Sequence, residues 1–317
     1  DIGGHTLIRA SIKNNKQINI LTNPNQYETF IRCMSIDDSN GLDVGKLEYI
    51  LQFKQNMVSE ATKYITNYDT CIATFFNTLF GNQQNKHFLR NYQLDSSLKY
   101  GCNPHQDFSA IFSINHSQVP FKIINGNFGY INVIDALNSW QLVKELSETI
   151  NKPCAASFKH TSPAGVGSSR PLSSLLQKIY GINKEEYEQL SDSAIAFIRA
   201  RNTDPMSSFG DFIAISHIVD KSCALQIKKE VSDGIIAPEY TPEALEILQN
   251  KKGGKYIILQ ANSEYINKNT VEFREMYGMA LCQTVNNYKM DLNNIGKIVT
   301  NNNDSLDIEA RENLAIS

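Results

Sequence analysis

Short apolar runs alternate with longer helical patterns along the chain, and this alternation constrains the fold more than any other feature. We predict strands at 121–124, 212–216 and 256–259. We predict helices at 133–150 and 184–199, and a further helix at Thr241-Pro242, because threonine is a favoured N-cap and proline a favoured first helical residue. Helices and strands that alternate in this way are typical of an α/β fold.

The N-terminal part of the chain is mainly helical in pattern. Gly3-Gly4 forms a predicted turn that leads into a helix, and a strand is predicted at 18–21. Between residues 43 and 80 apolar residues recur at helical spacing. That spacing predicts two helices, which we expect to meet near residues 67–69.

Length and composition narrow the class of protein. The 317 residues, with 41% hydrophobic and 20% charged side chains, describe an ordinary soluble globular protein with room for two domains. A glycine and amide linker at 81–85 predicts the boundary, so we divide the chain into 1–82 and 83–317. The net charge of -3 argues against a general nucleic-acid binder, and no run is long and apolar enough to predict a membrane role.

The cysteines and the chain ends give two further expectations. Six cysteines are scattered without a Cys-x-x-Cys pair, which predicts reduced thiols in a cytosolic enzyme and argues against structural zinc. The chain begins at Asp1 without an initiator Met and stops at Ser317 within the helical pattern of 305–317. We therefore expect both ends to have been cut from a longer protein.

Lys159 and His160 are adjacent in the stretch 155–166. Neighbouring side chains of a regular strand point to opposite faces, so the pair can serve one site only where the strand breaks. Thr161 to Gly165 supplies the predicted break. Histidine ordinarily titrates near pH 6.5, and a cation beside it favours the neutral form that can accept a proton. The pair therefore predicts a general base beside an electrophile, and the alternative is a surface lysine next to a hydrogen-bonded histidine.

Three other predicted loops carry polar side chains near apolar runs. The loop 99–106 contains Lys, Tyr, Asn and His, the loop 206–211 is small and polar with a phenylalanine and a glycine, and the loop 232–238 places an acid before an apolar segment. Each could be a plain turn. Together with 159–166 they offer a base, a lysine, an aromatic wall and a carboxylate, which suit a polar heteroaromatic substrate.

The absence of several known motifs makes the competing enzyme classes less probable. The chain has no Gly-x-Gly-x-x-Gly, no P-loop and no Gly-x-Ser-x-Gly elbow, which argues against dinucleotide, P-loop and serine hydrolase readings. A zinc deaminase needs His-x-Glu and Pro-Cys-x-x-Cys, and neither is present. We therefore predict a reaction without a catalytic metal.

Four long stretches, taken in order, carry a resemblance to a known family. They are 98–106 (LKYGCNPHQ), 157–165 (SFKHTSPAG), 199–212 (RARNTDPMSSFGDF) and 231–238 (VSDGIIAP). They resemble the bifunctional purine biosynthesis family that joins phosphoribosylaminoimidazolecarboxamide (AICAR) formyltransferase to IMP cyclohydrolase. The resemblance runs from Asp1-Ile2-Gly3-Gly4 to the last helical pattern.

The resemblance implies a fold and an activity. The expected fold is a cytidine-deaminase-like α/β formyltransferase portion without zinc, preceded by the tail of a methylglyoxal-synthase-like domain and a helical connector. The expected reactions are the last two steps to IMP in de novo purine biosynthesis. A formyl group passes from the co-substrate 10-formyltetrahydrofolate to AICAR, giving FAICAR, and ring closure then gives IMP. A cytosolic homodimer with composite sites is also implied.

The resemblance also assigns roles in formyl transfer. His160 matches the family's general base, and Lys159 matches its transition-state stabiliser. The positions that match the nucleotide site are Lys99, Tyr100, Phe209, Gly210 and Asp233. Lys99 departs from the usual arginine, so a bidentate phosphate clamp would become a point charge.

For the cyclohydrolase, Asp1 and Ile2 match nucleotide-binding positions and Lys13 matches the catalytic lysine. Asn15 stands where the family commonly has a histidine. The rest of that site, and the catalytic asparagine of the formyltransferase, are expected before Asp1 and after Ser317. We therefore expect this chain by itself to have little or no activity.

Two other function classes stay open from the residues alone. The first is a non-catalytic nucleotide-binding module that keeps the Gly210 and Asp233 contacts. The second is a metal-dependent deaminase-like hydrolase, which the missing zinc ligands disfavour.

Overall fold

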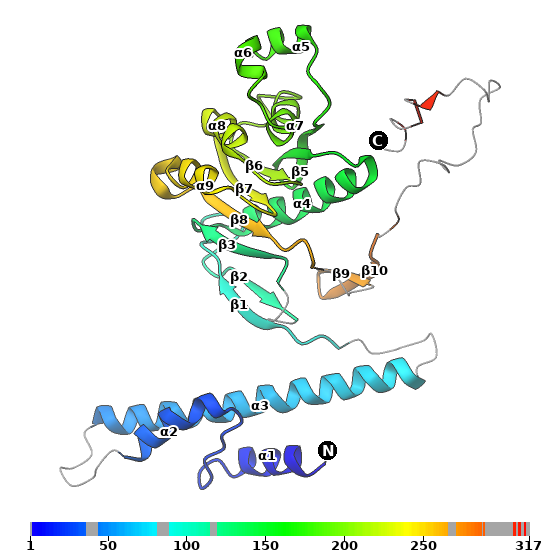
Figure 1. Cartoon of the computed structure of the whole chain (residues 1–317). Coiled ribbons are helices and arrows are strands. Elements are labelled where there is room, and N and C mark those ends of the chain that lie inside the picture. The colour runs from blue at the N-terminus through cyan, green and yellow to red at the C-terminus, as the bar shows by residue number, and fades with distance from the viewer. Residues whose placement is uncertain are drawn as a thin grey trace. The chain divides into compact units, whose positions relative to one another are not determined.

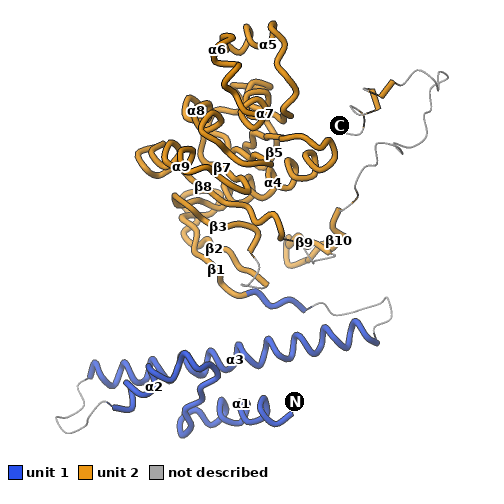
Figure 2. Tube along the Cα trace, in the orientation of Figure 1, with its two compact units in different colours: residues 1–92 blue, residues 93–317 orange. Residues whose placement is uncertain are grey.

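The computed structural model describes residues 2–35, 44–80, 89–114, 119–265 and 271–286, and residues 288, 307, 308, 310, 311 and 314. The chain divides into two compact units, 1–92 and 93–317 (Figure 2). The predicted linker at 81–85 and most of the helical pattern at 305–317 lie outside the described residues.

The first unit is helical. It contains α1 (Gly3–Lys13), a 3-10 turn η1 (Pro24–Gln26), α2 (Tyr27–Met34) and the long α3 (Val44–Phe80). Helix α1 packs on α3, where Arg9 forms an ion pair with Asp69 and the rings of His5 and Tyr68 lie 5.6 Å apart. These contacts attach α1 to the C-terminal half of α3.

Two predictions for this unit are wrong. Residues 44–80 form one helix of 37 residues and not two, because no Pro or Gly follows Gly45 in this segment to break it. Residues 18–21 form no strand, and none of the residues described in this unit forms a strand with which they could pair.

The second unit is built on a six-stranded mixed sheet (Figure 1). The strand order is β3-β8-β7-β6-β4-β5, and β6, β7 and β8 run parallel while the other pairings are antiparallel. The bounds are β3 (Phe121–Asn125), β4 (Cys154–Lys159), β5 (Ser162–Ser168), β6 (Asp211–Ile215), β7 (Ser232–Ala237) and β8 (Ile257–Ala261). Two short antiparallel pairs lie outside this sheet: β1 (Gln93–Ser97) with β2 (Ala110–Ser113), and β9 (Val271–Met276) with β10 (Met279–Thr284).

Helices cover both faces of this sheet (Figure 1). Helix α4 (Tyr130–Ile150) covers one face, and α7 (Asp192–Arg201), α8 (Lys221–Lys229) and α9 (Pro242–Gln249) cover the other. Two short helices, α5 (Ser174–Ile179) and α6 (Lys184–Tyr187), precede α7, and a 3-10 turn η3 (Lys251–Gly254) follows α9. The apolar residues of β6 alternate between the two cores, with Phe212 and Ala214 facing α4 and Ile213 and Ile215 facing the other helices. Because both faces of β6 are buried, its sequence is an unbroken run of apolar residues from Phe212 to Ile215.

The α/β prediction is confirmed for this unit, with two local corrections. The helix predicted at 184–199 is two helices, α6 and α7, because Ser191 begins a new helix by accepting a hydrogen bond from Ala194 N at 3.2 Å. The loop predicted at 232–238 is the buried strand β7. A Cβ on Gly234 would lie 2.6 Å from the Phe212 ring, so this glycine serves close packing between strands and not a turn.

Other predicted elements agree with the structure. Helix α4 begins at Tyr130, three residues before the predicted start, and Trp140 lies in the core beneath it. Thr241 caps α9 and Pro242 is its first residue, as predicted. Among the described residues, no helix combines the length and the apolar character needed to cross a membrane.

Candidate active site

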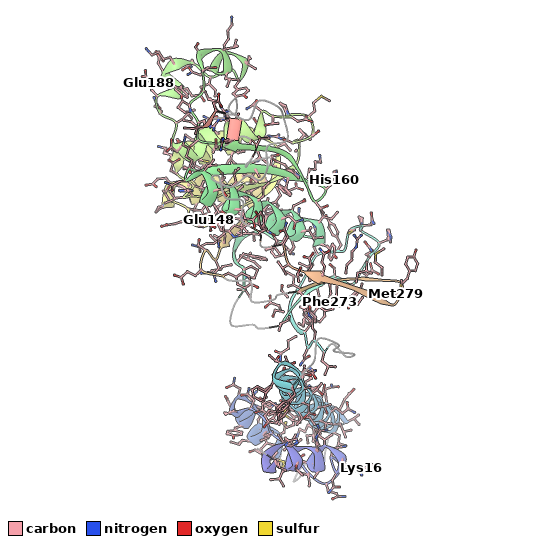
Figure 3. All side chains as sticks on the ribbon, turned by 90° about the vertical axis from the view of Figure 1, so that its right-hand side faces the viewer. Lys16, Glu148, His160, Glu188, Phe273 and Met279 are labelled. Atoms are coloured by element: carbon pink, nitrogen blue, oxygen red, sulfur yellow. The ribbon has the colours of Figure 1, made fainter. Side chains whose placement is uncertain are left out.

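The β4–β5 hairpin carries the Lys-His pair. Lys159 ends β4 opposite Ser162, so His160 and Thr161 alone form the turn. Both turn residues have positive φ, 53° and 67°, as tight two-residue hairpins require. The predicted break in the strand is real, but it lies at 160–161 and not at 161–165. Lys159 is half-buried, and His160 is exposed at the margin of the unit (Figure 3).

The Lys159 ammonium group joins this hairpin to the loop before β6. Its Nζ donates a hydrogen bond to the carbonyl oxygen of Phe209. It also lies 3.9 Å from the position that a Cβ on Gly210 would occupy, and Gly210 has a φ of 76°. A side chain at residue 210 would be strained by this positive φ and would come into contact with the ammonium group. The structure thus brings Lys159, Phe209 and Gly210 together.

An open cavity of about 480 Å³ adjoins this pair. It is lined by Lys159, His160, Ser162, Pro163, Ala164, Asp204 and Ser207. Asp204 accepts hydrogen bonds from Ser207 N at 2.9 Å and from Ser207 Oγ at 2.6 Å, and these bonds lower the pKa of its carboxyl group. The cavity therefore offers a cation, an imidazole and a carboxylate to one ligand.

Two carboxylates lie near the hairpin turn, one predicted and one not. Asp135, in α4, is buried and accepts a hydrogen bond from Thr161 N at 2.7 Å. Burial raises the pKa of Asp135, and the charge of Asp233 adds to this rise. The hydrogen bond from Thr161 and the charge of His160 act in the opposite direction and lower the pKa, but they do not cancel the rise. Asp233, in β7, is half-buried and ion-paired with Lys252 at 2.6 Å. His160 and Asp233 are therefore both within electrostatic range of Asp135.

Lys99 and Tyr100 belong to an irregular loop, as predicted, which is attached to the beginning of α4. Lys99 N donates to Phe128 O at 3.3 Å, and Tyr130 N donates to Tyr100 O at 3.2 Å. Asp135 follows in the second turn of the same helix. Helix α4 thus connects the Lys99-Tyr100 loop to the hairpin turn, although Lys99 itself is exposed and its Nζ lies 5.7 Å from the centre of the Tyr100 ring.

The predicted cyclohydrolase residues lie in the first unit and are not gathered. Ile2 immediately precedes α1 and Lys13 is its last residue, and both are exposed. A helix of 11 residues separates them by about 16 Å at 1.5 Å per residue. Asp1 lies outside the described residues.

The sequence analysis did not predict Asp135 or Lys252 as residues near the site. Asp135 did leave a signal, because it precedes Ala136 and lies four residues before Ser139, on the side of α4 that is buried. A charged residue at such a position needs a partner. Lys252 left no comparable signal, since its φ of 52° and its ion pair with Asp233 depend on the folded chain.

A buried polar cluster lies behind the site. Asp211 follows Gly210 directly, is completely buried, and accepts a hydrogen bond from Ser157 Oγ at 2.5 Å. The guanidinium group of Arg201 lies 3.9 Å from its carboxylate and also pairs with Glu230 at 3.1 Å. Burial raises the pKa of Asp211 to about 6, and the Ser157 hydrogen bond and the Arg201 charge only partly oppose this.

The titration of Asp211 predicts a pH-dependent stability. A carboxyl group whose pKa is higher in the folded state stabilises the fold below its unfolded pKa, and this stabilisation is lost as the pH rises through about 6. From pH 4 to pH 7 the free energy of unfolding should fall by about 2–3 kcal/mol through this group, at 1.36 kcal/mol per pKa unit. Asp211→Asn retains an oxygen for Ser157 but cannot titrate, so the wild type should lose that amount relative to the variant in urea unfolding. Parallel pH profiles for the two proteins would contradict this assignment.

Within the described part of the chain, no cluster of three or more His, Cys, Asp or Glu side chains is arranged to hold a metal ion.

Comparison with known proteins identifies relatives along most of the chain. A family model described as AICARFT/IMPCHase bienzyme matches residues 11–316. The chain is 28% identical over 295 residues to the bifunctional purine biosynthesis protein PurH of Halalkalibacterium halodurans, covering 91% of this chain and 50% of that protein. It is also 28% identical over 295 residues to PurH of Bacillus cereus strain ATCC 10987, covering 92% and 51% respectively. The chain therefore spans about half the length of these curated relatives.

Proposed function

The chain belongs to the AICARFT/IMPCHase bienzyme family, and we propose that its second unit supplies the base, the lysine and the nucleotide contacts for transfer of a formyl group to AICAR. The observation that carries this proposal is the hairpin turn that places Lys159 and His160 on one open cavity beside Gly210. In a regular strand these two side chains would point to opposite faces.

In the proposed reaction the 5-amino nitrogen of AICAR attacks the formyl carbon of 10-formyltetrahydrofolate. A carbon–nitrogen bond forms there, and the bond between that carbon and N10 of the folate breaks. His160 accepts the proton that leaves the amine and returns it to N10, so the products are FAICAR and tetrahydrofolate. Lys159 offsets the negative charge that develops on the formyl oxygen. Its hydrogen bond to the Phe209 carbonyl supports this role, because it holds the ammonium group at the cavity.

The nucleotide contacts are proposed around the same hairpin. Gly210 lies next to the Lys159 ammonium group, and Phe209, which is 58% exposed, offers a ring face to the base. Asp233 is proposed to accept hydrogen bonds from ribose hydroxyls, with Lys252 held beside its carboxylate by their ion pair. Lys99 and Tyr100 complete the proposed nucleotide site.

Further parts of the proposal follow from family membership. The second unit is proposed to have the cytidine-deaminase-like fold, which a mixed sheet with helices on both faces supports. Residues 1–82 are proposed to be the tail of a methylglyoxal-synthase-like domain with a helical connector, where Asp1, Ile2 and Lys13 serve ring closure of FAICAR to IMP and water. Residues 83–317 are proposed to belong to the formyltransferase domain, and the assembly is proposed to be a homodimer with composite sites.

Calorimetric titration of the purified chain with AICAR tests the nucleotide site. Asp233→Asn should weaken AICAR binding about tenfold or more, equal to about 1.4 kcal/mol, because the ribose hydroxyls lose a charged acceptor. Glu239→Gln is the matched control, since Glu239 is exposed and lies beyond the other end of β7. Equal affinities for the two variants would contradict the proposed site.

Binding of AICAR without formyl transfer is the expected result for residues 1–317 alone. Substantial formyl transfer by this chain would refute that expectation.

A further inference from the structure

The turn that carries His160 adopts an unfavourable backbone conformation. His160 and Thr161 have φ of 53° and 67°, in the left-handed region that non-glycine residues rarely adopt and that is worst for β-branched residues such as threonine. Asn-Gly and similar pairs are the usual choice for such turns. A turn with this sequence persists only where surrounding contacts hold it.

Asp135 makes such a contact. Its Oδ1 accepts the backbone N–H of Thr161 at 2.7 Å, and the residue is only 5% exposed. It lies in the 21-residue helix α4, which packs against β4, β6 and β7. The turn is therefore held by a carboxyl oxygen on a rigid element of the core, and not by another loop.

Asp135 also faces the charged groups that the proposed reaction uses. The charges of His160, in the turn, and of Asp233, in β7, both act on its carboxyl group. Asp233 is in turn paired with Lys252. Removal of the Asp135 side chain would therefore release the turn and alter the field at the base, while leaving the Lys159 hydrogen bond to Phe209 intact.

We propose that Asp135 is a positioning residue, whose carboxylate holds the His160–Thr161 turn in its left-handed conformation and so directs the imidazole toward the cavity. The inference depends on the proposed function for its catalytic consequence. Its structural half, the restraint on the turn, stands by itself and can be measured without substrate.

The structural half is tested by the hydrogen exchange rate of the Thr161 amide, measured by NMR on the deuterated 317-residue chain. Asp135→Ala should speed this exchange at least tenfold, because Thr161 is otherwise exposed. Asp135→Asn keeps an oxygen acceptor and should stay close to the wild type. Glu145→Ala removes an exposed acid from the same helix and should have no effect. An unchanged Thr161 exchange rate in Asp135→Ala would overturn the proposal. If Asp135→Ala fails to fold, Asp135→Leu replaces it, and slow Thr161 exchange in that variant would also overturn the proposal.

The catalytic half is tested by kinetics on the protein encoded by the whole gene. Asp135→Ala should lower kcat for formyl transfer ten- to a hundredfold while KM for AICAR changes less than about threefold. Asp135→Asn should recover part of the loss. A general loss of folding would not lower kcat while leaving KM nearly unchanged. It would also not be partly reversed by the isosteric Asp135→Asn variant. An unchanged kcat with a faster Thr161 amide exchange would overturn the positioning role. If the wild type transfers no formyl group, the proposed function fails, and the amide exchange alone decides whether Asp135 holds the turn.

Discussion

Replacing His160 by alanine should lower formyl transfer by about 10²–10⁴-fold, the usual contribution of a general base. The reason is positional as well as chemical. His160 occupies a two-residue turn beside Lys159 at an open cavity, and it is the only histidine among the described residues that line this cavity. Initial rates of FAICAR formation by the protein encoded by the whole gene measure the effect.

His217→Ala is the matched control for this variant. His217 is exposed, bonds to Ser216 Oγ at 2.9 Å, and follows the end of β6 that is remote from Gly210. Its replacement should leave formyl transfer unchanged. Ring closure of FAICAR should be unaffected in both variants, because the residues proposed for that step lie in the other unit. A His160→Ala variant with more than a tenth of the wild-type rate would count against His160 as the base.

Gly165→Ala should destabilise the second unit by about 3 kcal/mol or more, at the upper end of the usual cost of overpacking. A Cβ on Gly165 would lie 2.1 Å from the carbonyl oxygen of Ala200 and 2.8 Å from Thr203 Cβ. Neither contact can be relieved without moving α7 away from β5. The midpoint of urea unfolding should therefore fall, with the slope of the transition unchanged.

Gly181→Ala provides the comparison for this steric effect. Gly181 has a φ of 69° but nothing lies within 4 Å of its Cβ position, so alanine there costs only backbone strain, about 1 kcal/mol. Gly165 is not in the left-handed region, and its replacement costs only the collision. A Gly165→Ala protein as stable as Gly181→Ala would mean that the hairpin and α7 do not approach as described. Because β5 is paired with β4, the same displacement should also move Lys159 and His160.

The sequence predicted correctly those elements that depend on residues close together in the chain. Thr241 and Pro242 began a helix as expected, because capping depends on a few neighbouring residues. The break in the strand next to Lys159 was likewise visible in the sequence, although its length was overestimated. Phe212 to Ile215 read as a buried strand because both faces of the sheet are covered.

Three other misses have a different cause, since each depended on contacts between residues distant in the sequence. Residues 18–21 had the pattern of a strand but no described strand of the first unit is there to pair with them. Asp233-Gly234 has the composition of a turn, yet Gly234 lies between Phe212 and Ile257 in the sheet. Asp135 accepts the hydrogen bond from Thr161 N, a residue 26 positions away in the sequence, only because α4 packs against the hairpin. Spacing along the chain does not reveal such partners.

The site residues were identified mainly by resemblance, and the structure adds their arrangement. Lys159, Phe209 and Gly210 are in contact, and His160 and Asp233 both act on Asp135. Ile2 and Lys13 lie at opposite ends of α1. The arrangement therefore gives more support to the formyl transfer site than to the cyclohydrolase residues.

A crystal structure of this chain with bound AICAR would show whether the nucleotide binds at the Lys159–His160 hairpin. We expect the 5-amino nitrogen within hydrogen-bonding reach of the His160 ring, about 3 Å, with the ribose at Asp233 and the base beside Phe209 and Gly210. Nucleotide density elsewhere would contradict the account, for example in the separate cavity of about 220 Å³ that Arg201, Gln226 and Lys229 help to line.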